Sequence, residues 1–344
     1  MFKPLFPKMN YQNKVGNHKQ LGGIETSILD NGAGAGVRIA WIDTGSGLRY
    51  KVVIDRGMDI AEAIYNDCNL AWIAHVGIVK PQLLTDKGLS WLRTFGGGLL
   101  TTCGLDHVGG PETDEYGERG IHGQFSNLPA EIISIQQPNV LTGDLSFSIT
   151  GLIRQHKIFG PCLTLKRTIS GTIGNPSLKI DDEIVNEGNQ AVPFMILYHF
   201  NFGYPLLDQG SQIIYEGEHY VKSDPKFLEN PKDLTTVPNP SDLHAGTGES
   251  VVVVDMSNNK NSKANASLWN PKRMLGINLS WDKKELPYLI NWQHFAKKEY
   301  VMGIEPSNNP LNGQKKAREE GTLTFLQPNE IKKIQLELKI IKNI

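Results

Sequence analysis

The sequence predicts an all-β protein whose antiparallel sheets pack face to face, with few short helices. Strand signals dominate the chain, while helix signals are few. Strand-like runs also do not alternate regularly with long helical patterns. A parallel α/β sheet requires that alternation, so the pattern favours antiparallel sheets.

The first elements are a predicted hairpin and a predicted helix. Residues 37–42 and 48–54 are β-rich runs around the turn Thr44-Gly45-Ser46-Gly47, and this arrangement is typical of a hairpin. Residues 60–65 predict a third strand. Residues 81–95 are the best helix candidate because Leu83, Leu89 and Leu92 fall loosely at helical spacing, although Gly88 weakens the pattern.

The rest of the chain predicts further strands and two long loops. The alternation of apolar and polar residues over 331–341 is that of a half-exposed strand. Pro, Asn, Asp and Gly are frequent over 223–249, and Asn, Ser, Lys and Ala over 257–266, so we predict loops there. The other predicted strands are 131–135, 145–153, 163–169, 178–185, 192–198, 250–255, 274–281, 288–292, 300–304 and 321–326.

Length and composition exclude several classes of protein. We predict a single domain over 1–344, with 1–25 as an N-terminal extension. The net charge is −1, from 35 basic and 36 acidic residues without a basic stripe, so we expect no nucleic-acid partner. No apolar stretch suits a signal peptide or a membrane span, so we expect a cytoplasmic protein without a membrane partner. A homodimer is an open alternative.

Three short polar islands carry the candidate chemistry: GIHG at 120–123, YHFNFG at 198–203 and GIEPSN at 303–308. They supply the imidazoles of His122 and His199 and the carboxyl group of Glu305. These groups can move a proton from one oxygen to another near neutral pH. If the fold brings them together, they predict an acid–base site.

Each island also has a structural interpretation. His122 can be a turn residue bonded to the backbone, and His199 can be a core histidine with satisfied hydrogen bonds. Glu305 can belong to a salt bridge, but a carboxylate in an apolar strand is expensive to bury unless it is paired or functional. A metal site formed by the three side chains is an alternative.

Other polar groups are candidates for binding a ligand. Arg56 can hold a ligand hydroxyl or form a structural ion pair with Asp59, and Trp292 can stack on a sugar or serve the core. The glycine triplet at 96–98 lacks the spacing of a phosphate-binding motif. Our predicted substrate-binding residues are His122, Arg56, Asp106, Gln124, Trp292 and Asn308.

In this order, the islands resemble the aldose 1-epimerase (galactose mutarotase-like) superfamily. The phrases FGGGLLTTCGLD at 95–106, IHG at 121–123 and GIEPSN at 303–308 resemble a less characterised branch of it. The resemblance covers most of the chain and implies a galactose mutarotase-like β-supersandwich with one open sugar-binding cleft. The substrate-binding arginine and mid-chain aspartate of that family lack clear counterparts. Arg56, Asp106 and Asp208 are the candidates for them, and a sugar other than galactose is expected.

The resemblance also implies an activity. Glu305 would be the general base at the anomeric hydroxyl, His199 the general acid at the ring oxygen, and His122 a substrate-binding residue. The predicted function is therefore interconversion of the anomers of a free monosaccharide, without a cofactor. One alternative is a carbohydrate-binding protein without turnover. Another is a hydrolase or lyase, and a glycosidase would need a second carboxylate facing Glu305.

Overall fold

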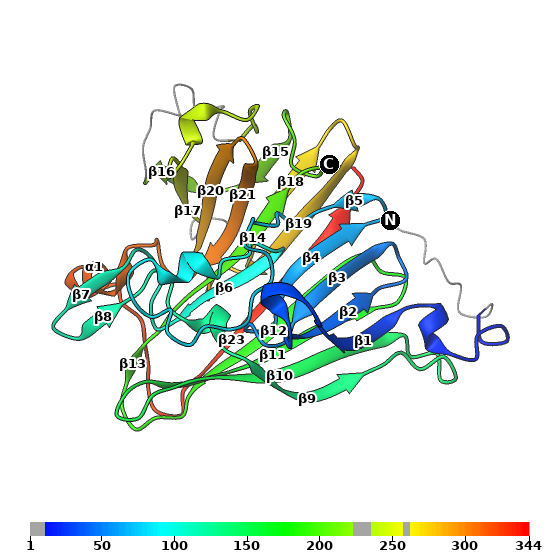
Figure 1. Ribbon diagram of the computed structural model, residues 1–344, viewed down its shortest axis with the longest axis horizontal. Helices are drawn as coiled ribbons and strands as arrows, with labels where there is room; N and C mark the ends of the chain where they lie inside the picture. Colours follow the sequence, from blue (N-terminus) through cyan, green and yellow to red (C-terminus); the bar gives the residue numbers. More distant parts are fainter. Residues whose placement is uncertain (1–10, 223–234, 257–261, 344) are drawn as a thin grey trace.

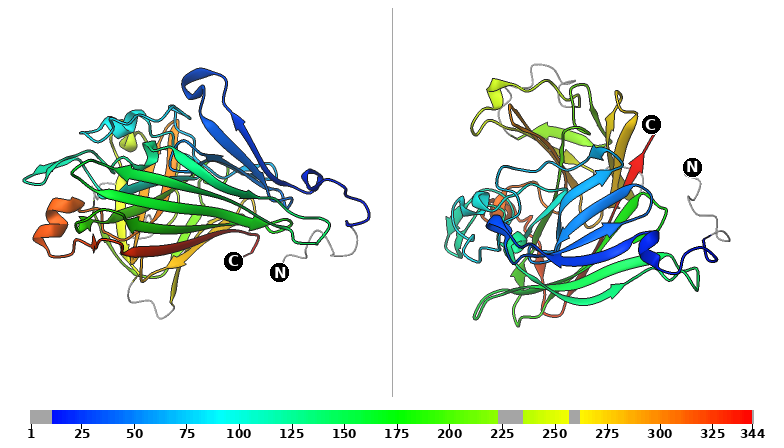
Figure 2. Two further views of the ribbon diagram at one scale, coloured as in Figure 1. Left: turned by 90° about the horizontal axis from the view of Figure 1, so that it is seen from below. Right: turned by 45° about the vertical axis from the view of Figure 1, so that its right-hand side comes forward.

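Two large antiparallel sheets form the body of the protein. The computed structural model describes residues 11–222, 235–256 and 262–343, so the predicted loop residues 223–234 and 257–261 lie outside the described residues. Figure 1 shows the strands, and Figure 2 shows the sheets stacked as layers. The predicted all-β class is confirmed.

The first sheet has 11 strands in the order β1-β2-β3-β4-β6-β14-β21-β20-β17-β16, with β5 paired to β4. Its middle strands β6, β14 and β21 come from distant parts of the chain and pair antiparallel. The bounds are β1 (Gly23–Ile28), β2 (Arg38–Asp43), β3 (Leu48–Val53), β4 (Asp59–Tyr65), β5 (Cys68–Asn69), β6 (Leu100–Leu105), β14 (Met195–Gly203), β16 (Glu218–Val221), β17 (Ser250–Asp255), β20 (Tyr288–Ala296) and β21 (Glu299–Ser307).

The second sheet has eight strands in the order β15-β18-β19-β23-β12-β11-β10-β9. Its bounds are β9 (Ala130–Gln136), β10 (Ser146–His156), β11 (Cys162–Thr172), β12 (Ser177–Asn186), β15 (Gln212–Tyr215), β18 (Lys263–Asn270), β19 (Leu275–Asp282) and β23 (Ile331–Ile341). Two short ribbons pair β7 (Glu112–Asp114) with β8 (Gly117–Arg119) and β13 (Val192–Pro193) with β22 (Phe325–Leu326).

Helices are few and short within the described ranges. The α-helix α1 (Gly313–Glu319) lies beside the β7–β8 ribbon at one end of the molecule (Figure 1). The 3-10 turns are η1 (His18–Gln20), η2 (Gly32–Gly34), η3 (Ser90–Arg93), η4 (Phe125–Asn127) and η7 (Asp242–His244). None of these described helices is long and apolar enough to cross a membrane.

The predicted helix over 81–95 is wrong. That segment contains only the 3-10 turn η3, and Gly88 has a left-handed φ of +50°. Leu83 is 62% exposed and Leu84 is 85% exposed, so the leucines do not form the continuous buried face that stabilises a helix. Apolar residues at loose helical spacing are therefore not enough to form a helix in this segment.

Two other expectations also need correction. The predicted loop over 257–266 extends too far, because Lys263 already begins β18, and alternate residues such as Ala264 and Ala266 are buried. The predicted strand over 321–326 is confirmed only for Phe325–Leu326. The hairpin around 44–47 is confirmed as the antiparallel pair β2–β3.

Alternation along β14 decides which side of the first sheet holds the polar islands. Successive side chains of a strand point to opposite faces. Tyr198 and Phe200 therefore join the core between the sheets, whereas His199 lies on the other face. That face is also covered, by a second apolar cluster that includes Trp91 and Phe95. Burial on both faces explains why the sequence of β14 is almost continuously apolar.

A buried ionic cluster joins the two sheets beneath β14. Arg167 of β11 is fully buried and contacts Asp182 of β12 at 2.7 Å and Asp59 of β4 at 3.0 Å. The hydroxyl of Tyr198 donates to Asp182 at 2.7 Å, and Thr102 of β6 donates to Asp59 from its backbone and side chain. Burial raises the pKa of Asp59 to about 6, against the opposing effect of Arg167.

We predict that Arg167→Met destabilises the protein by about 3–5 kcal/mol, because it leaves two buried carboxylates without their cation. Lys166→Met on the same strand is the matched control. Its exposed contact with Glu183 should change stability by about 0.5 kcal/mol or less. Urea unfolding measures both. A loss below about 1 kcal/mol in Arg167→Met would contradict the role given to this cluster.

Candidate active site

His199 and Glu305 lie side by side on neighbouring strands. The register that pairs Phe200 of β14 with Ile304 of β21 places them opposite each other. His199 Nδ1 lies 3.2 Å from Glu305 Oε1, and the side chains are only 6% and 2% exposed. Neither atom has a partner in hydrogen-bond geometry within the described residues. Buried polar atoms without such partners are unusual in proteins and favour a functional site.

The electrostatics of the pair follow from burial. Burial, then the charge of Glu249, raises the pKa of Glu305 well above its ordinary value. Burial, then the neighbouring His122, lowers the pKa of His199 well below its ordinary value. Since both charged forms are disfavoured, burial favours a pair that carries one acidic proton and no net charge. It can therefore give a proton at one atom and accept one at another.

His122 reaches the same place from the turn between Gly120 and Gly123. Its ring centroid lies 6.2 Å from that of His199, almost perpendicular to it. The φ of His122 is +58°, a left-handed conformation that is uncommon outside glycine and that clusters at functional sites. Its Nδ1 is buried without a hydrogen-bond partner among the described residues. Burial of most of the ring, then His107, lowers the pKa of His122 to about 3.

Aromatic rings cover the pair. The rings of Trp292 and Phe95 lie 5.2 and 5.3 Å from the His199 ring. Trp91 stacks on Phe95 at 4.4 Å and lies 5.0 Å from His122. Trp292 and His122 are partly exposed, so they separate the buried pair from solvent.

Glu249 is a residue that the sequence analysis missed. The indole Nε1 of Trp292 donates to Glu249 Oε2 at 2.7 Å, and the carboxylate raises the pKa of Glu305. Glu249 directly precedes β17, and Ser250 at the start of that strand pairs with Gln293 on β20. Only the pairing of β17 with β20 places Glu249 beside Trp292, and the sequence alone does not reveal which strands pair.

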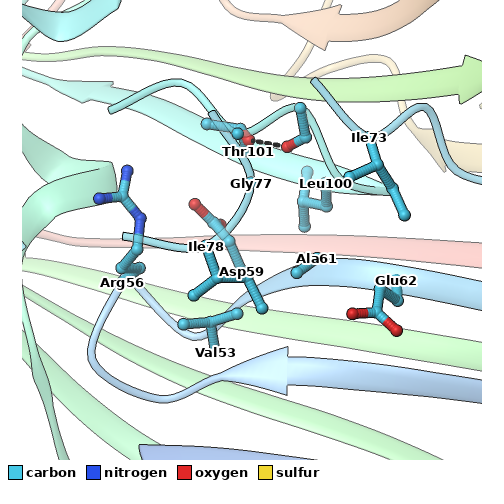
Figure 3. A pocket seen from close by; sticks show the side chains of 12 residues that line it. Val53, Arg56, Asp59, Ala61, Glu62, Ile73, Gly77, Ile78, Leu100 and Thr101 are labelled. Carbon is cyan, nitrogen blue, oxygen red and sulfur yellow. Dashed lines mark hydrogen bonds between the residues drawn. The ribbon is translucent and has the colours of Figure 1, made fainter. Parts of the chain in front are cut away.

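A cavity of about 220 Å³ lies along β6. Thr101 lines it and is directly opposite His199 in the β6–β14 pairing. Figure 3 shows Arg56 and Glu62 at opposite ends of the cavity, with Ile73 and Leu100 among its apolar walls. The guanidinium of Arg56 donates to Asn127 Oδ1 at 2.8 Å and to the carbonyl of Thr94 at 2.9 Å. Burial lowers the pKa of Arg56 to about 10.

The other predicted binding residues lie elsewhere. Asp106 and Gln124 line a separate polar cavity behind the His122 turn. Asn308 accepts from the backbone of Ile196 at 2.8 Å and donates to the carbonyl of Phe194 at 3.0 Å, so its side chain fastens β14. Asp208 contacts Lys272 at the surface. Of the predicted binding residues, the fold brings His122 and Trp292 to the pair.

The described residues do not form a recognisable metal site. No group of three or more His, Cys, Asp or Glu residues in the described ranges has an arrangement that could hold a metal ion. Imidazole and carboxyl groups such as those of His199 and Glu305 can themselves transfer protons.

The chain is similar to known proteins in sequence family and in fold. The family model described as "Domain of unknown function (DUF4432)" matches residues 34–340. No curated protein matches the chain. A candidate aldose 1-epimerase from Klebsiella pneumoniae has a similar structure, with a TM-score of 0.84 and 23% identity over 95% of this chain and 87% of that one.

Two further structures are less similar. A galactose mutarotase-like protein from Clostridium acetobutylicum gives a TM-score of 0.63 at 15% identity, covering 93% of this chain and 98% of that one. A galactose 1-epimerase from Lactobacillus acidophilus gives 0.57 at 12% identity, covering 93% and 99%. These likenesses confirm the predicted galactose mutarotase-like fold.

The raised pKa of Glu305 predicts a pH-dependent effect of Glu305→Gln on stability. The folded protein holds this proton more tightly than the unfolded chain, so wild type loses stability as pH rises above the ordinary value of about 4.5. Glutamine mimics the protonated acid and removes this loss. The free energy of unfolding of the variant, relative to that of wild type, should therefore increase as the pH rises from 4 to 8. Urea unfolding at several pH values measures this difference.

Glu299→Gln is the control, because its carboxylate is half-exposed on the same strand. A stability difference between Glu305→Gln and wild type that stays constant with pH would show that the pKa of Glu305 is not raised.

Proposed function

The chain belongs to the DUF4432 family, and we propose that it is an aldose 1-epimerase-like isomerase that interconverts the anomers of a free monosaccharide. One observation carries the proposal: His199 Nδ1 and Glu305 Oε1 lie 3.2 Å apart, and both atoms are buried without a hydrogen-bond partner in the described structure. A matched acid and base can accelerate a proton transfer at each of two oxygens. The likeness in fold to mutarotase-like proteins agrees with this chemistry.

The proposed reaction uses the single proton of the pair. In the sugar complex this proton lies on His199, where the ring oxygen can accept it, while the Glu305 carboxylate accepts a hydrogen bond from the anomeric hydroxyl. Glu305 takes the hydroxyl proton as His199 protonates the ring oxygen, and the C1–O5 bond breaks to give the open-chain aldehyde. The C1–C2 bond then rotates, and closure on the other face returns both protons.

The surroundings assign supporting roles. His122 donates a hydrogen bond to the sugar near the ring oxygen, which its position 6.2 Å from His199 allows. Trp292 and Phe95 offer apolar faces to the ring of the sugar. Because Glu305 is only 2% exposed, a sugar reaches the pair only when a covering side chain moves aside. Trp292 is the covering side chain that would move, because it is partly exposed to solvent. A hydrogen bond from its indole nitrogen to Glu249 holds it in place.

Glu249 bears on the hydrolase alternative. It supplies a second carboxylate near Glu305, and the two differ in environment, since Glu249 is exposed and Glu305 is buried. A glycosidase requires two such groups on either side of the scissile bond. Glu249 instead bonds the Trp292 indole, so we assign it to the positioning of that ring. Release of reducing sugar from glycosides by the wild type would favour the hydrolase.

We predict that His199→Ala and Glu305→Gln each slow anomer exchange by roughly 10²–10⁴-fold, the range for loss of one general acid or base. Exchange NMR on a panel of hexoses, pentoses and modified sugars measures the rate. His219→Ala and Glu299→Gln are the controls, since both residues lie away from the pair, and they should exchange at the wild-type rate. Thermal unfolding checks that all four variants are folded.

Wild-type protein that binds a sugar but never links its two anomeric signals would replace the isomerase with a carbohydrate-binding protein. Exchange that persists unchanged in both His199→Ala and Glu305→Gln would refute the assigned roles.

A further inference from the structure

A second cavity, of about 200 Å³, lies behind the turn that carries His122. Gly120 and Gly123 of that turn form part of its wall. Its lining contains no Val, Leu, Ile, Met, Phe or Trp among the described residues. Apart from Tyr116, Pro161 and Pro193, the lining side chains are polar or belong to glycine. Most small-molecule pockets are largely apolar, so this mainly polar lining needs a separate explanation.

Asp106 offers an acceptor to this cavity. Its Oδ1 accepts a hydrogen bond from the Gln155 side chain at 2.6 Å, and the buried Gln155 in turn accepts from the backbone of Leu105 at 3.0 Å. Asp106 is therefore held in place through one oxygen. Its Oδ2 makes no hydrogen bond to a described residue and is available to a ligand.

Gln124 offers both a donor and an acceptor. It is half-buried, precedes the turn η4, and makes no side-chain capping hydrogen bond there. Its amide has no hydrogen-bond partner in the described part of the chain. An amide can donate two hydrogen bonds and accept two, so Gln124 complements Asp106, which can only accept.

His107 is a third group in the wall, and it is 1% exposed. One ring nitrogen, Nε2, lies 2.8 Å from the carbonyl of Gly110 and so carries the proton that it donates. Nδ1 is then a bare acceptor. It has no hydrogen-bond partner in the described structure, and the nearest charged atom, Glu112 Oε1, is 3.6 Å away. This nitrogen is buried beside Glu112, which does not line the cavity, so His107 forms part of the wall without offering a ligand an acceptor.

The charges select the class of ligand. Asp86, Asp106 and Glu118 line the cavity together with Lys157 and Arg119. Arg119 already pairs with Glu112 at 2.8 Å and with Asp114, and Glu118 pairs with Lys87 at 3.4 Å. The remaining charge is negative, which disfavours phosphates and carboxylates. An ammonium ion would leave the donors of Gln124 unused. Hydroxyl groups both donate and accept, so they match Asp106 and Gln124 together.

From these contacts we infer that the cavity behind the His122 turn is a second binding site, for a small neutral polyol or sugar, distinct from the His199–Glu305 site. The inference does not depend on the proposed isomerase activity. The two sites share a wall, because Gly123 lines the cavity while His122 beside it faces His199.

Sorbitol is the probe, because it is a neutral polyol without an anomeric carbon and cannot turn over in the proposed reaction. NMR follows the side-chain amide signals of Gln124 and Gln155 in full-length, isotope-labelled protein during titration. Gln124→Leu identifies the Gln124 signal by its loss. We expect both signals to shift and saturate in wild type.

Two variants separate this site from the covered pair. Asp106→Asn keeps the bond from Gln155 but weakens the acceptor, and should reduce sorbitol affinity about five-fold, the factor for one lost hydrogen bond. Trp292→Ala should leave the affinity at the Gln155 signal unchanged, and Gln190→Leu is the remote control. Signals that do not saturate, or an affinity that falls in Trp292→Ala and not in Asp106→Asn, would overturn the inference.

Discussion

The guanidinium of Arg167 connects both sheets at the point where the candidate site depends on their alignment. From the second sheet it contacts Asp59 of β4 in the first sheet. Its other partner, Asp182, accepts a hydrogen bond from the hydroxyl of Tyr198, the residue before His199. Burial alone would lower the pKa of Arg167, but the two carboxylates raise it above its ordinary value. The cluster therefore fixes β4, β6 and β14 relative to one another, and with them the face on which His199 meets Glu305.

The ionisable side chains on that face lower the stability of the protein. Apolar packing around His199 lowers its pKa and raises that of Glu305, so two ionisable groups lie buried with imperfect hydrogen bonding. Such an arrangement costs free energy in the empty protein. A sugar hydroxyl and a ring oxygen would supply the missing partners.

The sequence identified the two residues of the pair but not their surroundings. The all-β class followed from recurrent strand signals, and His199 and Glu305 were recognisable as polar residues within apolar strands. Long-range contacts were not recognisable: Arg56 is bound to Asn127, and Glu249 reaches Trp292 only through the pairing of β17 with β20. Asp106 and Gln124 lie on loops. A loop has no repeating pattern of apolar residues, so the sequence does not show where its side chains point. The leucines at 83–92 have the spacing of a helix, but they are exposed, and spacing alone does not show whether a residue is buried.

The most direct test of the central claim is a double-variant cycle on anomer exchange, using wild type, His199→Ala, Glu305→Gln and the combined variant. Groups that act as a unit on one shared proton give strongly non-additive losses. The account predicts that the combined variant exchanges anomers about as slowly as the slower single variant. If the two losses multiply in full, the residues act independently, and the shared-proton pair is wrong.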